Sequence, residues 1–541
     1  MKYIKYSYII LLVLLNTFTI NSNAQNTERL FDIAKNIEIY TNVYKELNKN
    51  FVDDIDPSIL MKTGIEAMTK SLDPYTVYYS ESEAESYKIA IEGKYSGIGT
   101  VMKNIDSVIT VVDLYKDSPA FNAGLRIGDQ ILAVNGKSTE GKSTSDITNV
   151  VRGAPGTEIE FEILSYGDKS PKTVKVIRDE INIPNVPFKG MVNDTVAYIK
   201  LTTFTDKAGA NIKSDLKKLM DSFDVKYVIL DLRDNGGGLL REAINVVNVF
   251  VDKDQELVFT KGKLESQNKS YKTMSNPLDA TIPLVVLING RSASASEIVS
   301  GSIQDLDRGV LIGQKSFGKG LVQNFFDVGY NSRLKTTISK YYIPSGRCIQ
   351  SKTYDNGKAV EIDKSTQSEF STKNGRKVYD VGGVEPDIVI KELDRNDFIN
   401  NIDRQNEVFK FANEYFKNHP DLSPDKVLGI DYTHDFSDYL KKNKFKYVTD
   451  AEEKVNDLSK TLDMKNSSTL GQLEDMVDKQ KSEMETNSKE YLNQSIGNEL
   501  ILRFYLEDNG VKYQLHDDPD IKEAVKLFSN IKEYNKILNK N

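Results

Sequence analysis

The first part of the chain has the residue spacing of an amphipathic helix. From residue 28 onward, apolar residues recur every three or four positions, namely Leu30, Ile33, Ile37, Tyr40, Val43 and Leu47. That spacing places them on one face of a helix. We therefore predict an N-terminal helical region over residues 25–92.

Between residues 93 and 180 the pattern changes to short runs in which apolar and polar residues alternate. Such runs, separated by Gly, Asp, Asn and Pro, are typical of β-strands joined by turns. The predicted strands cover residues 107–113, 131–134, 158–164 and 173–177. Asn135-Gly136, which directly follows the second of them, predicts a tight hairpin turn. Residues 93–180 are therefore expected to form a small β-module.

From residue 195, continuous apolar runs alternate with helix-periodic ones. Repeated strand–helix units predict a largely parallel sheet covered by helices, so we expect an α/β core over residues 181–394. Its expected strands are 195–201, 226–232, 283–288 and 309–312, and its expected helices are 208–220, 239–251 and 295–306. Residues 395–541 are charged and helix-periodic, which predicts a separate C-terminal helical domain. The fold class is therefore multidomain α+β.

The N-terminus has the pattern of a secretory signal peptide. Lys2 and Lys5 precede an apolar run over residues 8–15, and Ser22-Asn23-Ala24 places small residues before a cut at Gln25. This predicts a signal peptide over residues 1–24, with an uncleaved N-terminal anchor as the alternative. No later segment approaches the roughly 20 apolar residues that span a bilayer. We therefore expect a periplasmic or cell-envelope protein with no integral membrane span after cleavage.

Composition and charge narrow the chemistry further. The 541 residues carry a net charge of −8, whereas a nucleic-acid binder usually has a basic excess. The three histidines (His419, His434 and His516) all lie beyond residue 400, and Cys348 is the single cysteine. These counts disfavour a Cys/His zinc site and exclude a disulfide within the chain. Any chemistry in the first 400 residues must therefore proceed without histidine.

Three strand-to-helix or strand-to-loop turns contain residues that can carry chemistry. The first, residues 231–238, ends in three glycines and either binds an oxyanion through its N–H groups or is a plain turn. The second, residues 289–297, contains Ser294, which is either a nucleophile or the partner of Glu297 in a helix capping box. The third, residues 315–320, places Lys319 between two glycines, where a desolvated amine is a general base and a solvated one is inert.

Several overlapping motifs fail on inspection. Residues 313–319 resemble a phosphate-binding P-loop, but Gly320 occupies the position of its metal-binding Ser or Thr. Ser316-Phe317-Gly318-Lys319 has the S-x-x-K spacing of penicillin-recognising enzymes, but no S-D-N triplet exists and Lys62-Thr63-Gly64 precedes it. Residues 290–294 lack the last glycine of a G-x-S-x-G elbow.

Residues 60–390 resemble the carboxyl-terminal processing peptidases, also called tail-specific proteases. The resemblance rests on ordered motifs: 198–204, 231–238, Ser292-Ala293-Ser294-Ala295-Ser296-Glu297, Gln304-Asp305, 317–323, 342–347 and 383–387. It implies a core of the crotonase/Clp-protease type and an enzyme that needs neither a metal nor a cofactor. It also implies a supporting role for Asp305 beneath the helix.

The resemblance assigns the catalytic residues. It implies that Ser294 is the nucleophile, that Lys319, 25 residues later, is the base, and that Gln323 positions the lysine. The expected oxyanion donors are the N–H of Ala295 and that of Gly237 or Gly238. A Ser–Lys pair needs no histidine, in agreement with the composition of this region.

The β-module at 93–180 resembles a PDZ domain. Gly97, Ile98, Gly99 and Thr100 resemble its carboxylate-binding loop, whose N–H groups would hold a substrate's C-terminus while the peptide adds as a strand. A glycine-rich hairpin without a ligand is the alternative. The expected partners are proteins or peptides with free C-termini, and a homodimer through residues 395–541 is expected by analogy with the family.

Two functions are consistent with these residues. The first is a serine endopeptidase that recognises protein C-termini through its PDZ domain and cleaves by a Ser294/Lys319 dyad through an acyl-enzyme. The second is a secreted peptide-binding scaffold that has lost catalysis. Because Ser294, Lys319 and Gln323 are all present, the sequence favours the enzyme.

Overall fold

The computed structural model describes residues 28–391, 395–427, 429–462, 467–504, 515 and 518–540. The expected signal peptide, residues 1–24, lies outside them. The chain divides into two compact units, of which the first comprises the chain up to Ser80 together with Phe325–Thr336 and Tyr354–Ala359, and the second comprises the rest. Within the described ranges, no helix combines the length and the apolar character that crossing a membrane requires.

The first unit contains the predicted N-terminal helix, at residues 28–50, followed by α2 (Pro57–Lys70) and β1 (Val77–Tyr79). Strand β1 pairs antiparallel with the outer part of β18 (Ser332–Tyr342). The periodicity predicted the first helix correctly but not a buried face. Leu30, Ile37 and Val43 are 63%, 62% and 52% exposed, because a pattern shows which residues share a face without showing what covers it.

A six-stranded sheet forms the centre of the second unit, in the order β10-β11-β12-β15-β16-β23. All neighbours pair in parallel except β10 with β11. The strands are β10 (Phe188–Met191), β11 (Val196–Lys200), β12 (Tyr227–Asp231), β15 (Leu284–Ile288), β16 (Val310–Gly313) and β23 (Ile388–Val389). The parallel core that the βα pattern predicted is therefore present.

Three helices cover one face of this sheet: α6 (Ala208–Ser222), α7 (Leu240–Val247) and α8 (Ala295–Asp305). Helix α7 ends earlier than its apolar pattern predicted, at Val247 instead of 251. The reason is Asn248, whose side chain accepts the N–H groups of Met274 and Ser275 and donates to the Val251 carbonyl. A short polar side chain that bonds nearby backbone groups competes with the helix at such a position.

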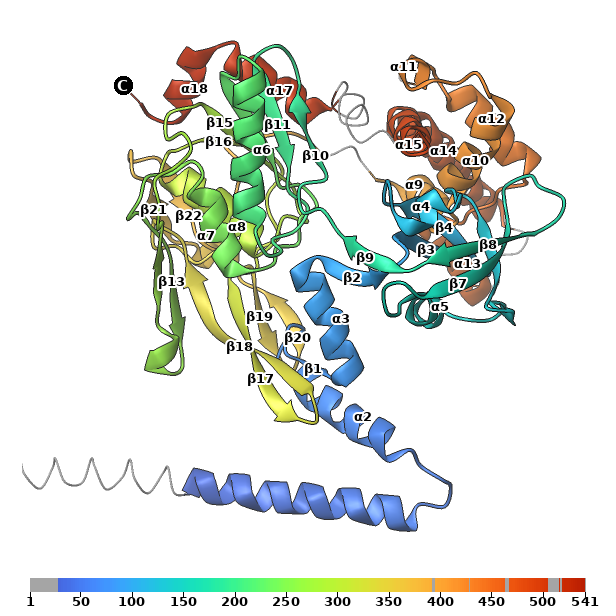
Figure 1. The fold of residues 1–541 in the computed structure, drawn as a ribbon, viewed down its shortest axis with the longest axis horizontal. Helices are drawn as coiled ribbons and strands as arrows, with labels where there is room; N and C mark the ends of the chain where they lie inside the picture. The colour runs from blue at the N-terminus through green and yellow to red at the C-terminus, as the bar shows by residue number, and fades with distance from the viewer. Residues whose placement is uncertain are drawn as a thin grey trace, which may run out of the picture. The chain divides into compact units, whose positions relative to one another are not determined.

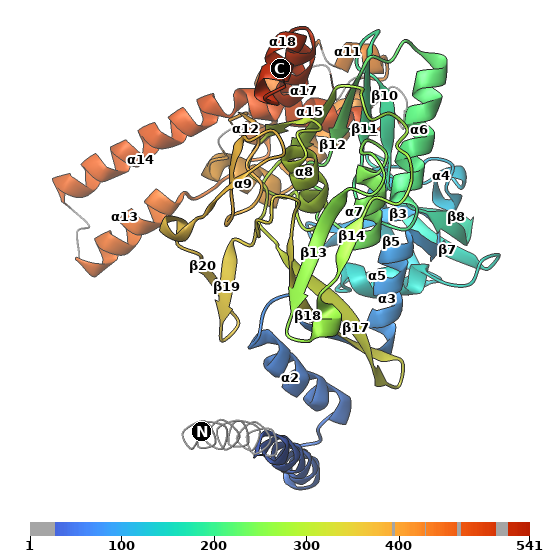
Figure 2. The ribbon, with the colours of Figure 1, turned by 90° about the vertical axis from the view of Figure 1, so that its left-hand side faces the viewer.

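The opposite face is covered by the end of the chain, α17 (Pro519–Phe528) and α18 (Ile531–Ile537). Figure 1 and Figure 2 show these helices on the side of the strands away from α6. Ile521, Leu527 and Phe528 pack against Ile229 and Leu287 of the strands. The sheet is therefore buried on both faces, as parallel sheets require.

The C-terminal region is consequently not one body. The sequence predicted a single helical domain over residues 395–541, but only part of it forms a bundle with a core of its own. The bundle helices are α9 (Asp397–Arg404), α10 (Glu407–Asn418), α11 (Pro424–Val427), α12 (Thr433–Lys442), α13 (Asp450–Thr461), α14 (Ser468–Asn487) and α15 (Lys489–Leu502). Helices α17 and α18 belong to the sheet instead, because their apolar side chains complete its second face.

The β-module is a second antiparallel sheet, ordered β3-β4-β5-β7-β8, with β6 beside β5. Its elements are β3 (Thr100–Ile105), β4 (Val108–Leu114), α4 (Pro119–Asn122), β5 (Gln130–Val134), β6 (Lys137–Ser138), α5 (Thr144–Val151), β7 (Glu158–Leu164) and β8 (Lys172–Ile177). A ribbon of β2 (Lys94–Gly97) and β9 (Asp179–Asn182) precedes and follows it in sequence. Asn135 and Gly136 both have positive φ angles (48° and 72°) between β5 and β6, which is the hairpin turn that this dipeptide favours.

A third sheet lies beyond the core. In the second unit, the inner half of β18 pairs with β13 (Glu256–Gly262), and β13 pairs with β14 (Ser270–Lys272). Strand β17 (Leu321–Gly329) leads from the core into the β17–β18 hairpin. Strand β17 begins two residues after Lys319.

Candidate active site

Ser294 closes a short connection between β15 and α8, which we call the serine loop (residues 289–294). All five residues of β15 and all eleven of α8 are buried, so both ends of the loop are fixed. Ser294 itself has a φ of 56°, a region that residues other than glycine seldom occupy. Such strain costs of order 1–3 kcal/mol and concentrates at functional sites.

The three serines of the Ser-Ala-Ser-Ala-Ser run have different surroundings. Ser292 and Ser296 are fully buried, and their hydroxyls donate to the carbonyls of Leu232 and Asn235, each at 2.8 Å. Ser292 therefore ties the serine loop to Leu232, directly before the glycine loop (residues 233–238), and Ser296 ties the first turn of α8 to Asn235 within that loop. Ser294, by contrast, is partly exposed. It is the serine of this run with a side chain open to a substrate.

Glu297, on the first turn of α8, connects Ser294 with Lys319. Its Oε2 accepts the N–H of Ser294 at 2.8 Å and the N–H of Lys319 at 2.9 Å. Both backbone nitrogens therefore lie within hydrogen-bond distance of one oxygen atom. The sequence predicted Glu297 only as a capping residue for Ser294, and that contact is present.

The same carboxylate also receives two donors on its other oxygen. Oε1 accepts the hydroxyl of Ser316 and the N–H of Gly318, both at 2.6 Å. Glu297 is fully buried. Burial raises the pKa of Glu297, and the four donors oppose that change because they favour the charged form. Glu297 thus holds the serine loop and the lysine loop (residues 314–320) together.

Tyr341 adds a second link between the two loops. Its hydroxyl donates to the Ser294 carbonyl at 3.2 Å, while its own N–H donates to the Gly320 carbonyl at 3.0 Å. The ring is fully buried, and burial raises the pKa of its hydroxyl well above the ordinary value. Tyr341 is therefore a neutral donor over the physiological range. No sequence motif pointed to this residue.

The glycine loop approaches Ser294 closely because it lacks side chains. A Cβ at Gly237 would lie 2.9 Å from Ser294 Cβ and 3.0 Å from the nitrogen of Ala295. The N–H of Gly237 donates to Asn235 Oδ1 at 2.9 Å, so it is already used. Ala295 is the first residue of α8, where a helix leaves its N–H groups without internal partners. The roles of Ala295 and of Gly237 or Gly238 as oxyanion donors stay predictions.

The remaining predicted catalytic residues occupy the lysine loop and β17. Lys319 is partly buried, and Gly318 beside it has a φ of 88°, where a Cβ would lie 2.5 Å from Ser351 Cβ. Gln323 lies on β17, and its Nε2 donates to Thr337 Oγ1 on β18 at 3.3 Å. The predicted role of Gln323 in orienting the lysine stays a prediction.

Asp305 lies at the other end of α8 and is buried. It accepts Arg347 Nη2 at 2.8 Å and the N–H of Ser345 at 3.0 Å. This carboxylate therefore anchors the loop after β18 to the end of α8.

In the β-module, the predicted carboxylate-binding loop joins β2 to β3. Gly99 has a φ of 80°, and a Cβ there would lie 2.4 Å from Ser118 Cβ. The carbonyls of Ile98 and Gly99 accept the N–H groups of Ala120 and Tyr115. These hydrogen bonds hold the loop against the segment that follows β4. The Oγ1 atom of Thr100 is buried and has no partner within the described part of the chain. Strand β3 is the edge of its sheet.

Family profiles match the chain in the same three regions. The profile of peptidase family S41 matches residues 195–363, and that of a PDZ domain matches residues 110–165. The C-terminal helical domain of probable PDZ-proteases matches residues 398–528. The chain therefore combines a peptidase region, a PDZ domain and a helical region.

Curated relatives agree with these matches. A carboxy-terminal-processing protease of Bartonella bacilliformis is 34% identical over 343 residues, which cover 63% of this chain and 77% of the relative. A probable CtpA-like serine protease of Staphylococcus aureus is 33% identical over 353 residues, covering 64% and 69%. The protein is thus a serine-type protease. It belongs to the carboxy-terminal-processing proteases of peptidase family S41.

Solved structures include two similar chains. The photosystem II D1 C-terminal processing protease is 26% identical, with a TM-score of 0.33, and the match covers 60% of this chain and 91% of that one. The PDZ domain of a carboxy-terminal protease from Vibrio cholerae, solved with a peptide, is 25% identical with a TM-score of 0.16. That match covers 16% of this chain and 98% of that domain.

Proposed function

We propose that the protein is an endopeptidase that cleaves through a Ser294/Lys319 dyad and an acyl-enzyme. The observation that carries the proposal is the shared oxygen of Glu297, which accepts the N–H groups of Ser294 and Lys319. It ties the two backbone positions together without histidine. Glu297 itself does not contact the scissile bond in this scheme, and it acts by position.

The chemistry needs Lys319 as a neutral amine. Lys319 takes the proton of Ser294 Oγ as the oxygen attacks the scissile carbonyl, and it then donates that proton to the departing amine. The negative charge on the carbonyl oxygen meets the N–H groups of Ala295 and Gly238. Water then attacks the acyl-enzyme with Lys319 again as base, which releases the new C-terminus and restores the Ser294 hydroxyl. Losing one oxyanion donor typically lowers the rate by about 10²–10³-fold.

An alternative nucleophile, Ser316 of the S-x-x-K motif, is disfavoured by its contacts. Its hydroxyl donates to Glu297 Oε1 and accepts the N–H of Val384, both at 2.6 Å, and the residue is buried. A hydroxyl with both roles filled is poorly placed to attack a substrate. Ser294, by contrast, is partly exposed.

We also propose that the PDZ domain selects substrates by their free C-termini. The unpartnered Thr100 Oγ1 lies in the loop predicted to bind the carboxylate, together with Gly97, Ile98 and Gly99. Strand β3 has one side unpaired within its sheet, which is the side that an added peptide strand would use. These observations support peptide capture at the β2–β3 loop.

Further parts of the proposal rest on the sequence. We propose export by the signal peptide at residues 1–24 to the periplasm or cell envelope, and a homodimer through the helical region at 395–541. For the core we propose the crotonase/Clp-protease type, which is supported by parallel βα units with the nucleophile at a helix start. The boundaries 25–92, 93–180 and 181–394 are kept as proposed domain limits.

The decisive experiment compares the wild-type protein with Ser294→Ala, Lys319→Ala and Ser316→Ala. The substrate is an unfolded protein with a free apolar C-terminus, and circular dichroism checks that each variant folds. We expect the first two variants to lose proteolysis and the third to retain at least part of it. Full activity in Ser294→Ala combined with its loss in Ser316→Ala would overturn the proposed dyad.

A further inference from the structure

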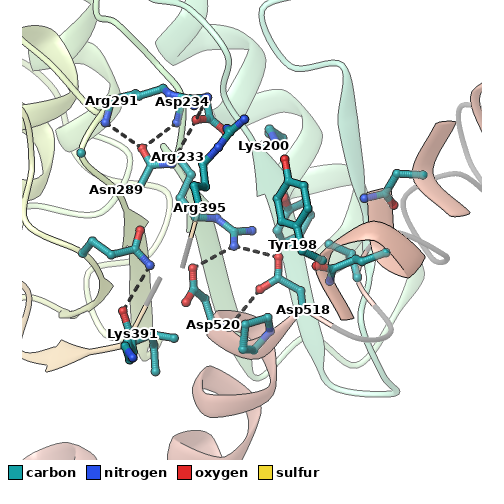
Figure 3. A pocket seen from close by; sticks show the side chains of 18 residues that line it. Tyr198, Lys200, Arg233, Asp234, Asn289, Arg291, Lys391, Arg395, Asp518 and Asp520 are labelled. Carbon is teal, nitrogen blue, oxygen red and sulfur yellow. Dashed lines mark hydrogen bonds and ion pairs between the residues drawn. The ribbon is translucent and has the colours of Figure 1, made fainter. Parts of the chain in front are cut away.

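One cavity lies beside the catalytic loops but does not include the predicted dyad. It has a volume of about 620 Å³, and it is lined by Arg233 and Asp234 of the glycine loop and by Asn289 and Arg291 of the serine loop (Figure 3). Its far wall is the start of α17, with Asp518 and Asp520. The start of α17 therefore lines the same cavity as the glycine loop and the serine loop.

Arg233 joins the two sides of this cavity. Its Nη1 lies 2.7 Å from Asp518 Oδ2 and 2.8 Å from Asp520 Oδ2, and Figure 3 draws these ion pairs. Its Nε and Nη2 donate to Asp231 at the end of β12, the shortest contact being 2.6 Å. The guanidinium of Arg233 thus links the end of β12, the glycine loop and the start of α17. A planar fork of donors suits such a bridge better than a lysine would.

The bridge is largely removed from solvent. The side chains of Arg233, Asp518 and Asp520 are 15%, 18% and 4% exposed, and that of Asp231 is fully buried. Asp520 Oδ1 has no partner within the described residues, so the carboxylate depends on Arg233. Buried ion pairs contribute little net stability because desolvation offsets their attraction. What such a pair provides is a defined geometry.

Arg233 lies in the same loop as the glycines of the proposed oxyanion site. Three residues after Arg233, the chain enters Gly236-Gly237-Gly238. Between them Asn235, fully buried, donates to the Leu201 carbonyl at 2.8 Å and accepts the Gly237 N–H. The loop is held at Arg233, at Asn235 and at Gly237, whose carbonyl accepts the N–H of Phe204 at 3.1 Å. Arg233 in turn is held from outside by α17.

We propose that Asp518 and Asp520 are positioning residues for catalysis: they hold Arg233, and through it the glycine loop, in the arrangement that stabilises the oxyanion. This inference rests on the proposed Ser294/Lys319 mechanism. It gives α17 a role in the chemistry in addition to covering the sheet. Because the oxyanion exists only during the reaction, the effect falls on kcat and spares KM.

The test uses amide replacements that preserve shape. Asp518→Asn keeps a good N-cap for α17, whose Asp520 and Ile521 N–H groups it receives, and Asp520→Asn removes the second charge. For the double variant of the full-length protein we expect kcat to fall about tenfold or more, since small displacements of catalytic groups are costly. We expect KM to change less than twofold and the melting temperature not to fall. Glu523→Gln, on the same helix and paired with Lys526, is the matched control and should behave as wild type.

A mutant cycle separates positioning from packing. Arg233→Lys should lower kcat as well, and adding Asp518→Asn and Asp520→Asn to it should cause no further loss, because both act through Arg233. Wild-type kcat in the double Asn variant, multiplied losses in the combined variant, or a loss that merely follows a lower melting temperature would each overturn the inference. Ser294→Ala is measured alongside. If it is inactive while the double Asn variant is fully active, the positioning role of Asp518 and Asp520 is contradicted and the proposed dyad is not. Activity in Ser294→Ala contradicts the dyad itself.

Discussion

Among single residues, Glu297 has the most concentrated set of contacts in the site. Replacing it by Gln keeps the shape but turns one acceptor oxygen into a donor, so the side chain can no longer accept from both loops at both ends. We expect Glu297→Gln to lower kcat on the order of 10²-fold, because a small misplacement of Ser294 against Lys319 has that effect.

Steady-state proteolysis checks this prediction, and a second buried glutamate provides the control. Glu242 on α7 accepts the N–H of Gly209 and the amide of Asn245, and it is as buried as Glu297. Glu242→Gln should cost stability and leave kcat within a few-fold of wild type. Equal effects of the two substitutions on kcat would show that burial of a carboxylate matters, and not its position between the loops.

Asp520 predicts a pH dependence of stability. Burial raises its pKa to about 6, and the nearby Arg233 opposes the rise, whereas an unfolded Asp titrates near pH 3.9. The folded state therefore holds this proton more tightly between about pH 4 and pH 6. Its contribution to stability is complete below about pH 4 and is lost as the pH rises through 6.

Asp520→Asn imitates the protonated form at every pH. Relative to wild type, we expect the variant to gain about 2–3 kcal/mol in the free energy of unfolding between pH 4 and pH 7. Thermal or denaturant unfolding at pH 4.5 and 7.5 measures the difference. A difference that stays constant across these two pH values would contradict the raised pKa of Asp520.

At the scale of elements, the last two helices matter through one hydroxyl as well as through apolar contacts. Tyr534 OH on α18 accepts the N–H of Leu284 at 2.9 Å and donates to the Leu284 carbonyl at 3.1 Å. These backbone groups belong to the first residue of β15, inside the protein. Tyr534→Phe would remove both hydrogen bonds and leave the buried Leu284 N–H without this acceptor, which costs about 1–3 kcal/mol.

We therefore expect Tyr534→Phe to destabilise the core by about 2 kcal/mol or more while α17 stays docked. The matched control is Tyr447→Phe, whose hydroxyl meets an exposed Glu485 at 3.2 Å in the helical bundle. That change should cost under about 0.5 kcal/mol. Unfolding followed by circular dichroism distinguishes the two, and a negligible effect of Tyr534→Phe would show that water replaces its hydroxyl.

The sequence predicted the helices and strands better than it predicted which of them pack against one another. The buried strands were identifiable because both of their faces are largely apolar, so 226–232 and 283–288 were mainly hydrophobic segments close to the observed β12 and β15. Residues 395–541 were predicted only in general terms to be helical, and α17 is one of the helices found there. Nothing in that pattern shows that Ile521 and Phe528 face the sheet, because periodicity defines a face and leaves its partner unspecified.

The candidate site likewise contains residues that the sequence could predict and residues that it could not. Ser294, Lys319 and the glycine loop were predicted from motifs whose residues are adjacent in sequence. Glu297 was recognised only as a cap, because its contacts with Gly318 and Lys319 join segments that are more than twenty residues apart. Tyr341 and Asp520 carry no local signal at all. Such residues become visible only when the chain has folded.

For the whole molecule, we propose that substrate capture and cleavage belong to different modules, so that each can be altered separately. Gly99→Ala should disturb the β2–β3 loop, because its φ is 80° and the new Cβ would lie 2.4 Å from Ser118 Cβ. We expect KM for a substrate with a free C-terminus to rise about tenfold, since loss of charge-assisted contacts weakens binding by that order. The preference for a free over an amidated C-terminus should also disappear.

Gly156→Ala is the control for this measurement. Gly156 has the same φ of 80°, in the same module, but nothing lies within 4 Å of a Cβ there. It shares the backbone strain of the first substitution without the collision. If both variants keep a wild-type preference for free C-termini, terminal recognition does not occur at this loop.

The packing of α17 and α18 against the sheet also has a consequence for biosynthesis. The ribosome makes these helices long after it has made Ser294 and Lys319, yet one face of the strands that carry both loops stays bare until the helices arrive. A nascent or C-terminally clipped chain therefore contains every reacting group while it lacks the support that aligns them. We therefore expect a chain truncated before α17 to have lower proteolytic activity than the chain that includes α17 and α18.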